Sequence, residues 1–329
     1  MRVRLNVCSL ALIGTFTAAL IPARRQWQRM HFPDSMKWIS SVILLLLSAC
    51  ATQLDDSASD SRSVVAGNVM KLGNITNPRI TESSGLAVSR RDPAVLWTHN
   101  DGGGKRQDLY AISRAGQTVS DFGVTGAWLD DWEDIAIDDR GHLFLGDIGD
   151  NDLSRQTIGV HQIDEPDLSA NPSSIVRVIK SWSLRYPKGR FNSEALVIWN
   201  ESGYVITKVF DDAHAELYRF SLINSAKTQT LQLVGELQID SPVTGADISA
   251  DGNLLAVVAK AGAYAYRIDG DISRAVGVRP YRVKFQNAHI ESCAFVLQGL
   301  LATSELKAVY LFTDEAFRTG PPPTEKTKD

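Results

Sequence analysis

Short apolar runs, cut by Gly, Asp and Asn, recur along most of the chain. Runs of this length between turn residues are typical of β-strands. One five-residue motif occurs five times, and its first residue carries a carboxyl or a hydroxyl group in four of the copies. The copies lie at 84–88, 133–137, 194–198, 246–250 and 291–295, so they begin 49, 61, 52 and 45 residues apart. Such a period predicts an array of equivalent supersecondary units.

Each unit holds four strand-like runs. The expected strands are 84–89, 95–99, 108–113 and 118–124 in unit one; 133–138, 142–146, 159–163 and 176–184 in unit two; 194–199, 204–207, 216–220 and 230–239 in unit three; 246–250, 254–258, 263–268 and 281–285 in unit four; and 291–296, 300–303 and 308–312 in unit five. Unit five is one strand short, and residues 67–72 supply that strand from the other end of the domain. This pattern predicts an all-β fold, a five-bladed β-propeller closed by an N-terminal strand. A six-bladed propeller is the alternative, if the long second unit conceals another blade.

The amino-terminal region carries a targeting signal. Residues 39–49 form an apolar run that suits the hydrophobic region of a signal peptide and is too short to span a bilayer as a helix. It ends in the letters LSAC at 47–50, which resemble the lipobox of bacterial lipoproteins. That resemblance implies a lipid anchor on Cys50, and Ala51 after it implies an outer-membrane lipoprotein facing the periplasm. An ordinary signal sequence with a chance cysteine is the alternative.

These features divide the chain into five parts. Residues 1–35 are expected to be a mis-start or an extra leader, 36–49 the lipoprotein signal peptide, 50–66 a flexible tether, 67–317 the β-propeller and 318–329 a disordered tail. Cys293 is then the only thiol of the folded part, so no disulfide supports it. The net charge of -4 gives no indication of nucleic-acid binding.

The first residue of each copy of the motif is a candidate functional residue. In a propeller the first strand of each blade lies nearest the axis, so a residue at its entrance can point into the central tunnel. The motif places at that entrance Ser84, Glu133, Glu194, Ala246 and Glu291. Thr244, two residues before Ala246 and on the same side of the strand, is the other candidate for the fourth blade.

Three carboxylates in a narrow tunnel repel one another unless they are protonated or bind a cation. Oxygen ligands without His or Cys suit a hard ion, and a wide, irregular ring favours Ca²⁺ over Mg²⁺. The predicted ligands are Ser84, Glu133, Glu194, Thr244 and Glu291. The alternative is that these residues only cap blade strands around a water-filled tunnel.

The loops after each second strand are expected to open on the same face. They carry a second ring of polar residues, Asn100, Asp101, Asp147, Lys208, Lys260 and Glu305, with Asn151 and Arg155 just outside. Lysines beside a cation suit a phosphate or carboxylate ligand, and Asp101 or Asp147 is the candidate general base for a metal-bound water. Alternatively, the lysines only neutralise the acids in a structural network.

Two resemblances add to this picture. The order of hydroxyl and glutamates is similar to that of the calcium-activated nucleotidases (the apyrase family), as are the runs at 132–137 and 143–149. This resemblance implies one Ca²⁺ in a five-bladed tunnel, although that family's basic substrate-binding segments are not found in the sequence. The runs at 97–102, 131–136, 146–151 and 192–196 look typical of uncharacterised secreted bacterial propellers, which implies no activity.

The sequence therefore favours a lipid-anchored periplasmic propeller with a calcium-binding tunnel, acting as a binding or scaffold protein. The alternative is a calcium-dependent hydrolase of phosphoric esters, nucleotidase- or phytase-like. The expected partners are the lipid bilayer, through Cys50, and a small anionic ligand or a protein on the propeller face.

Overall fold

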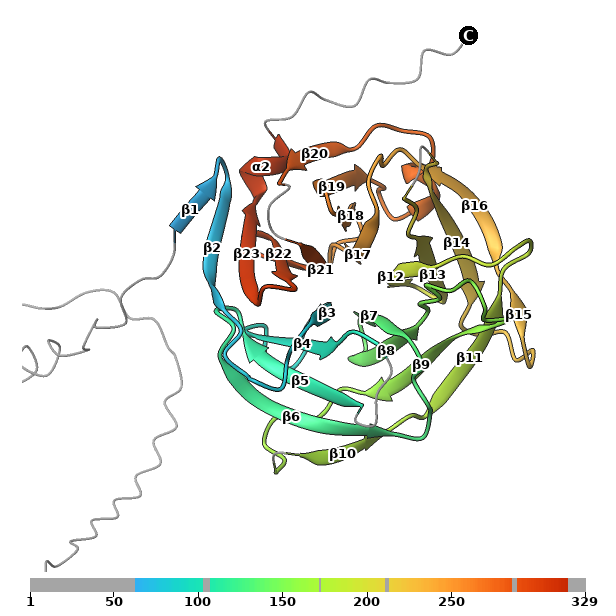
Figure 1. Cartoon of the computed structure of the whole chain (residues 1–329), viewed down its shortest axis with the longest axis horizontal. Coiled ribbons are helices and arrows are strands. Elements are labelled where there is room, and N and C mark those ends of the chain that lie inside the picture. Colours follow the sequence, from blue (N-terminus) through green and yellow to red (C-terminus); the bar gives the residue numbers. More distant parts are fainter. Residues whose placement is uncertain (1–62, 103–106, 172, 211–212, 286–288, 319–329) are drawn as a thin grey trace, which may run out of the picture. The chain divides into compact units, whose positions relative to one another are not determined.

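The computed structural model describes residues 63–102, 107–171, 173–210, 213–285 and 289–318. Within these residues the strands form five sheets around one axis, so the chain is a five-bladed β-propeller as predicted (Figure 1). The six-bladed alternative is therefore wrong. No helix of the described residues is long and apolar enough to cross a membrane. The predicted signal peptide and Cys50 lie outside the described residues, as do the predicted leader and nearly all of the tail.

Each blade runs outward from the axis through four antiparallel strands. Blade 1 contains β3 (Ser83–Val88), β4 (Val95–Asn100), β5 (Asp108–Ser113) and β6 (Thr118–Thr125). Blade 2 contains β7 (Trp132–Ile137), β8 (His142–Asp147), β9 (Ile158–Asp164) and β11 (Lys180–Arg185). Blade 3 contains β12 (Ser193–Trp199), β13 (Ser202–Thr207), β14 (Ala215–Ser221) and β16 (Gln232–Leu237). Blade 4 contains β17 (Val243–Ile248), β18 (Leu254–Ala259), β19 (Gly262–Arg267) and β20 (Tyr281–Lys284), with the 3₁₀ turn η2 (Ile272–Ala275) before β20.

Blade 5 joins the two ends of the domain, as the sequence predicts. Its strands β21 (Ile290–Val296), β22 (Gly299–Ser304) and β23 (Ala308–Thr313) are completed by β2 (Val69–Asn74), which pairs antiparallel with β23. A further strand, β1 (Ser63–Ala66), pairs with β2, so strand structure begins within the segment predicted as a tether. The short helix α2 (Asp314–Arg318) follows β23.

Two predicted strands are divided between neighbouring blades. The run 176–184 separates into β10 (Ser174–Arg177), which pairs parallel with β6 of blade 1, and β11, which stays in blade 2. The run 230–239 separates into β15 (Gln229–Thr230), which pairs parallel with β11, and β16. The prediction of one strand in each run is wrong because each first half covers the outer edge of the preceding blade, whose N–H and C=O groups would otherwise face solvent.

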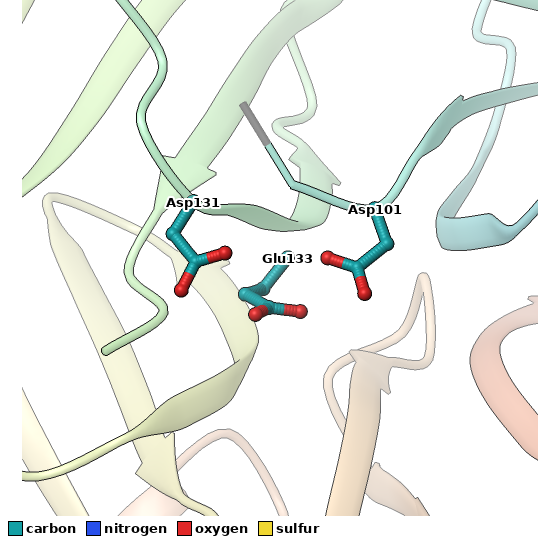
Figure 2. Close-up of side chains that lie close together, drawn as sticks. All are labelled: Asp101, Asp131 and Glu133. Atoms are coloured by element: carbon teal, nitrogen blue, oxygen red, sulfur yellow. The ribbon is translucent and has the colours of Figure 1, made fainter. Parts of the chain in front are cut away.

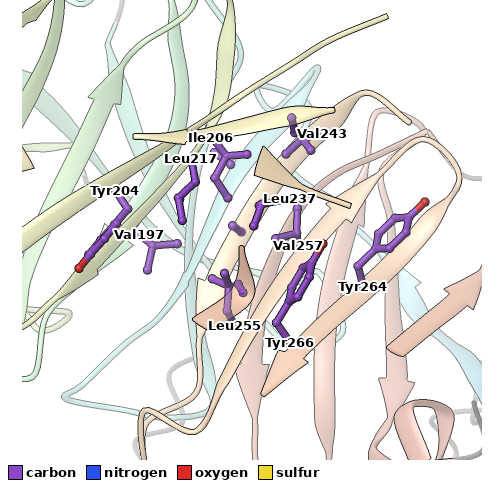
Figure 3. Packing of buried hydrophobic residues seen from close by; sticks show 14 of the residues in the cluster. Val197, Tyr204, Ile206, Leu217, Leu237, Val243, Leu255, Val257, Tyr264 and Tyr266 are labelled. Carbon is purple, nitrogen blue, oxygen red and sulfur yellow. The ribbon is translucent and has the colours of Figure 1, made fainter. Parts of the chain in front are cut away.

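The hydrophobic core lies in the interfaces between neighbouring blades. Alternate side chains of a strand point to opposite faces, and the second strand of each blade is covered on both. In β4, for example, Leu96 packs towards blade 5 and Trp97 towards blade 2. This double burial explains why the second strands read as unbroken apolar runs. Figure 3 shows one such interface, in which Leu217 of blade 3 and Val257 of blade 4 belong to one cluster.

The inner strands β3, β7, β12, β17 and β21, together called the hub, surround the axis (Figure 1). Buried carboxylates tie some of them together. Asp134 on β7 accepts hydrogen bonds from the backbone N–H of Leu196 on β12 and of Ile135, each at 2.8 Å. Asp247 on β17 accepts one from Phe295 on β21 at 2.7 Å. Burial raises the pKa of Asp134 well above its ordinary range and that of Asp247 to about 6.

The substitution Asp134→Ala tests this link between blades. We expect it to lower the free energy of unfolding by about 2–5 kcal/mol, because two buried N–H groups lose their acceptor. Urea unfolding measures the change. The control is Asp139→Ala, at an exposed position, which should shift stability by less than about 0.5 kcal/mol. Equal stability of the two variants would contradict the role of Asp134.

Candidate functional site

A β-bulge interrupts the inner strand of every blade near its start. In β7 the antiparallel pairing skips Glu133, and in β12, β17 and β21 it skips Glu194, Thr244 and Glu291. In blade 1 the irregularity comes one position later and includes Gly85, whose φ is 56°. A bulge re-aims the side chain of its extra residue. In blades 2 to 5 the bulge therefore acts on the equivalent residue, at the end of the hub here called its upper end.

The bulge decides between the two candidates in blade 4. Thr244 is the skipped residue, equivalent to Glu133, whereas Ala246 pairs with Val257 two positions further along. The motif copy at 246–250 is thus two residues out of register with the other four copies. A pattern of period two looks the same after a shift of two residues, which is why the sequence left this position open.

Three carboxylates meet at the upper end of the hub. Asp101 follows β4, Asp131 precedes β7 and Glu133 lies on β7, and one oxygen from each lies within 4.8 Å of the others (Figure 2). Glu133 is only 3% exposed, and its Oε1 has no hydrogen-bond partner in the described part of the chain. Gly149 leaves room beside them, because a Cβ there would lie 2.4 Å from both Glu133 Oε1 and Asp131 Oδ2.

Burial and mutual repulsion make it unfavourable for all three carboxyl groups of this cluster to be ionised at once. Burial, followed by the neighbouring Glu194, Asp101 and Asp131, raises the pKa of Glu133 well above its ordinary range. Burial and the charge of Asp101 raise the pKa of Asp131 to about 6. Without a cation Glu133 therefore keeps a proton that a glutamic acid normally loses at neutral pH, and Asp131 loses its proton at a higher pH than usual. A divalent cation would remove the cause of that retention.

Glu194 lies in a different setting because a lysine neutralises it. Lys208, which follows β13, forms an ion pair with Glu194 Oε1, and Asn192 donates to the same oxygen at 3.3 Å. Burial by itself lowers the pKa of Lys208, but the combined attraction of Glu194, Glu291 and Glu133 raises it. The ammonium group therefore stays charged beside the acid cluster.

Glu291 is paired with a second carboxyl group. Burial, a hydrogen bond with Glu305 and the charge of Glu194 raise the pKa of Glu291 to about 9. Glu305 follows β22, and its carboxylate lies 3.5 Å from Nδ1 of His289. Glu291 thus keeps its proton at neutral pH.

The two hydroxyl candidates join neighbouring blades. Ser84 Oγ donates to the carbonyl of Glu133 at 2.6 Å, and Thr244 Oγ1 donates to the carbonyl of Ile290 at 2.8 Å. Both hydroxyl hydrogens are committed to the backbone of the next blade. The five predicted ligands therefore all lie at one end of the hub, but their side chains occupy separate settings.

The predicted base Asp147 belongs to a local network. Its Oδ1 accepts from the backbone N–H of Asp130 and Asp131 at 3.0 and 2.8 Å, and its Oδ2 forms an ion pair with Arg155 at 2.7 Å. Arg155 also donates to the carbonyl of Gly149 at 2.7 Å. This network holds the loops that carry Asp131 and Gly149 in place.

Two amides of the predicted outer ring are similarly engaged. Asn100 accepts from the N–H of Thr81 and donates to the carbonyl of Arg79, each at 2.8 Å. Asn151 accepts from Asn192 at 2.9 Å. Both side chains fix the loops around the upper end of the hub.

Lys260 lies on the same face of the propeller and has a side chain free of hydrogen bonds among the described residues. It is exposed and makes no ion pair with the described residues. Its Nζ lies 6.0 Å from the ring centroid of Phe210, and Lys208 Nζ lies 5.7 Å from the same centroid. Phe210 is 66% exposed, so the ring and the two lysines form an accessible edge beside the acid cluster.

Asp131 and Gly149 are the members of this site that sequence reasoning missed. Asp131 lies two residues before Glu133, so an extended chain places both on the same side, and this signal was present in the sequence. Gly149 acts through a contact between loops, which no local pattern reveals.

Comparisons with known proteins show no family for this chain. No family model matches it, and no curated protein sequence matches it. Among solved structures it is similar to a chain of a nidogen/laminin complex (14% identity, 68% of this chain and 72% of that chain, TM-score 0.41). It is also similar to Kuenenia stuttgartiensis hydrazine synthase (10% identity, 70% of this chain and 72% of that chain, TM-score 0.40) and to Staphylococcus aureus virginiamycin B lyase (10% identity, 73% and 69%, TM-score 0.39). Similarities this low carry no argument about function, and the fold rests on the strand pairing.

The raised pKa values predict how stability depends on pH. In EDTA, the free energy of unfolding should fall as the pH rises from about 4 to about 9, because Asp131 and Glu291, with folded pKa values of about 6 and about 9, bind more protons in the folded state than in the unfolded state. Chemical denaturation at a series of pH values measures this slope. The variant with both Asp131→Asn and Glu291→Gln should show a shallower slope, and a wild-type stability that increased with pH over this range would contradict the assignment.

Proposed function

We propose that the protein is a lipid-anchored periplasmic β-propeller whose hub binds a divalent cation, Ca²⁺ before other ions, and that it acts as a binding or scaffold protein. The observation that carries this proposal is the buried, unpartnered Oε1 of Glu133 beside the oxygens of Asp101 and Asp131. A buried acceptor without a donor is costly, and a cation is the partner that also cancels the surrounding negative charge.

The size of the cluster suits Ca²⁺. Oxygens bound to one Ca²⁺ lie about 2.3–2.6 Å from the ion and hence at most roughly 5 Å from one another, and the three oxygens of this cluster lie within 4.8 Å of one another. Mg²⁺ demands a near-regular octahedron and usually keeps several waters, whereas Ca²⁺ accepts an irregular set of carboxylates. Carboxylates without His or Cys also favour a hard ion. Asp101, Asp131 and Glu133 would hold the ion.

The bonding around the cluster favours binding over catalysis. Asp147 accepts two backbone hydrogen bonds and an ion pair with Arg155, so it is poorly placed to take a proton from water. Asp101 is part of the cation cluster. The second candidate, a calcium-dependent hydrolase of phosphoric esters, is favoured by Lys260 and Lys208 beside Phe210, where an anion could meet both lysines and the ion.

Glu133→Gln is the decisive variant for the cation. Wild-type protein should melt at a higher temperature in Ca²⁺ than in EDTA, because the ion binds the folded state only. Glu133→Gln should lose most of this difference while melting in EDTA about as high as wild type, because the amide resembles the protonated carboxyl that Glu133 carries without a cation. Differential scanning calorimetry measures both values.

The matched control is Glu236→Gln on the exposed side of β16, which should keep the full calcium response. A wild-type melting temperature indifferent to Ca²⁺ would exclude the cation site. A panel of phosphoric esters, assayed with Ca²⁺ on wild type and Lys260→Gln, separates the two functions: turnover that falls in the variant would favour the hydrolase.

The anchor is tested separately at Cys50. In a bacterial host, wild-type protein should fractionate with outer membranes, and Cys50→Ala should not be acylated and should leave that fraction, because several acyl chains are needed for stable anchoring. Labelling with an alkyne fatty acid measures acylation directly. Label retained in Cys50→Ala would contradict the assignment.

A further inference from the structure

A cavity of about 370 Å³ lies at the lower end of the hub, away from the acid cluster. Ile137, Ile198 and Ile248 line it from β7, β12 and β17, and they are 8%, 3% and 9% exposed. Each lies four residues after the bulge residue of its strand, which corresponds to roughly 13 Å along the axis of a strand. The hub is thus acidic at one end and apolar at the other.

An aromatic side chain, that of Trp199, lies beside the three isoleucines. Trp199 lines the cavity, and its Nε1 donates to the carbonyl of Gly270 at 3.0 Å. A Cβ at Gly252, whose φ is 69°, would lie 2.3 Å from the indole ring. The ring is therefore held in one orientation by a hydrogen bond and by close packing on a glycine.

A fixed guanidinium group completes the site. Arg90, in the turn between β3 and β4, donates from Nε to the carbonyl of Asp138 at 3.1 Å and from Nη2 to that of Ile137 at 3.5 Å. Its Nη1 makes no hydrogen bond with the described residues, and Arg90 lines the cavity. An arginine already oriented by backbone carbonyls loses little freedom when it binds an anion.

The other polar groups of the rim are mostly committed. Asp138 accepts from the N–H of His142 and from its ring, each at 2.8 Å. Ser249 donates to Asp251 at 2.6 Å and accepts from the N–H of Leu254. Asp139, exposed at the rim, is the one nearby acid whose carboxylate has no hydrogen bond among the described residues. Its charge disfavours ligands with more than one negative group.

We propose that this cavity is a second binding site, for a small molecule with an aromatic or branched apolar body and a single carboxylate. The isoleucines and Trp199 bury the body, and Arg90 receives the carboxylate in a charge-assisted hydrogen bond. The volume lies within the range of small-molecule sites, which typically combine an apolar lining with a few oriented polar groups. The site does not depend on a cation in the hub.

The experiment titrates full-length protein with 4-phenylbutyrate and with its primary amide, and follows the indole N–H resonance of Trp199 by NMR in EDTA. The acid should shift this resonance and bind about tenfold more tightly than the amide, because only the acid carries the charge that Arg90 recognises. Arg90→Gln should lower the affinity for the acid to that for the amide. Asp139→Asn should raise the affinity for the acid, because it removes a negative charge that repels the carboxylate.

A cavity-filling variant locates the site without touching the core. Ala250 lines the cavity and is exposed, so Ala250→Trp should abolish binding of the acid, whereas Ala226→Trp at an exposed position outside the cavity should not change it. Equal binding of acid and amide, no binding of either, or unchanged affinity in Ala250→Trp would overturn the proposal.

Discussion

The convergence of five strands on one axis is the constraint on which the rest of this structure depends. Side chains at equivalent positions of these strands cannot avoid one another, so each level of the hub has a chemical character of its own. Backbone groups there must also find partners across blade boundaries. The carboxylates of Asp134 and Asp247 and the hydroxyls of Ser84 and Thr244 supply such links. Polar side chains thus stabilise the centre of a protein whose apolar core lies between its blades.

The same convergence gathers charge at the upper end of the hub. Lys208 neutralises Glu194, and Glu291 keeps its proton beside Glu305, so the described residues resolve the repulsion at these two acids themselves. At Glu133 the charge of Lys208 offsets only part of the rise in pKa, and Oε1 has no hydrogen-bond partner among the described residues while Asp131 and Asp101 lie beside it. This difference between three equivalent glutamates places the acid cluster on one side of the ring. Fold alone would not have made that distinction.

The hub has two ends with opposite character. A shift of four residues along β7, β12 and β17 leads from Glu133, Glu194 and Thr244 to three isoleucines. Strand alternation returns to the same side after every second residue, so one strand can present an oxygen at one end and a methyl group at the other. An oxygen-lined end suits an ion, and an apolar end beside Arg90 suits an organic anion. The propeller can therefore carry two independent sites on one set of strands.

The sequence by itself favoured five blades over six, and it predicted the closing strand and the residues at the head of four of the five repeats. A repeat of this length is a property of the chain, and alternation of apolar and polar residues survives without tertiary contacts. Only the tertiary structure decided the rest. It placed Thr244 rather than Ala246 in the ring, because a bulge is a property of strand pairing. It divided two predicted strands between blades, since their partners lie on the preceding blade. It also separated Glu133 from Glu194 and Glu291, because their different partners come from loops far apart in the sequence.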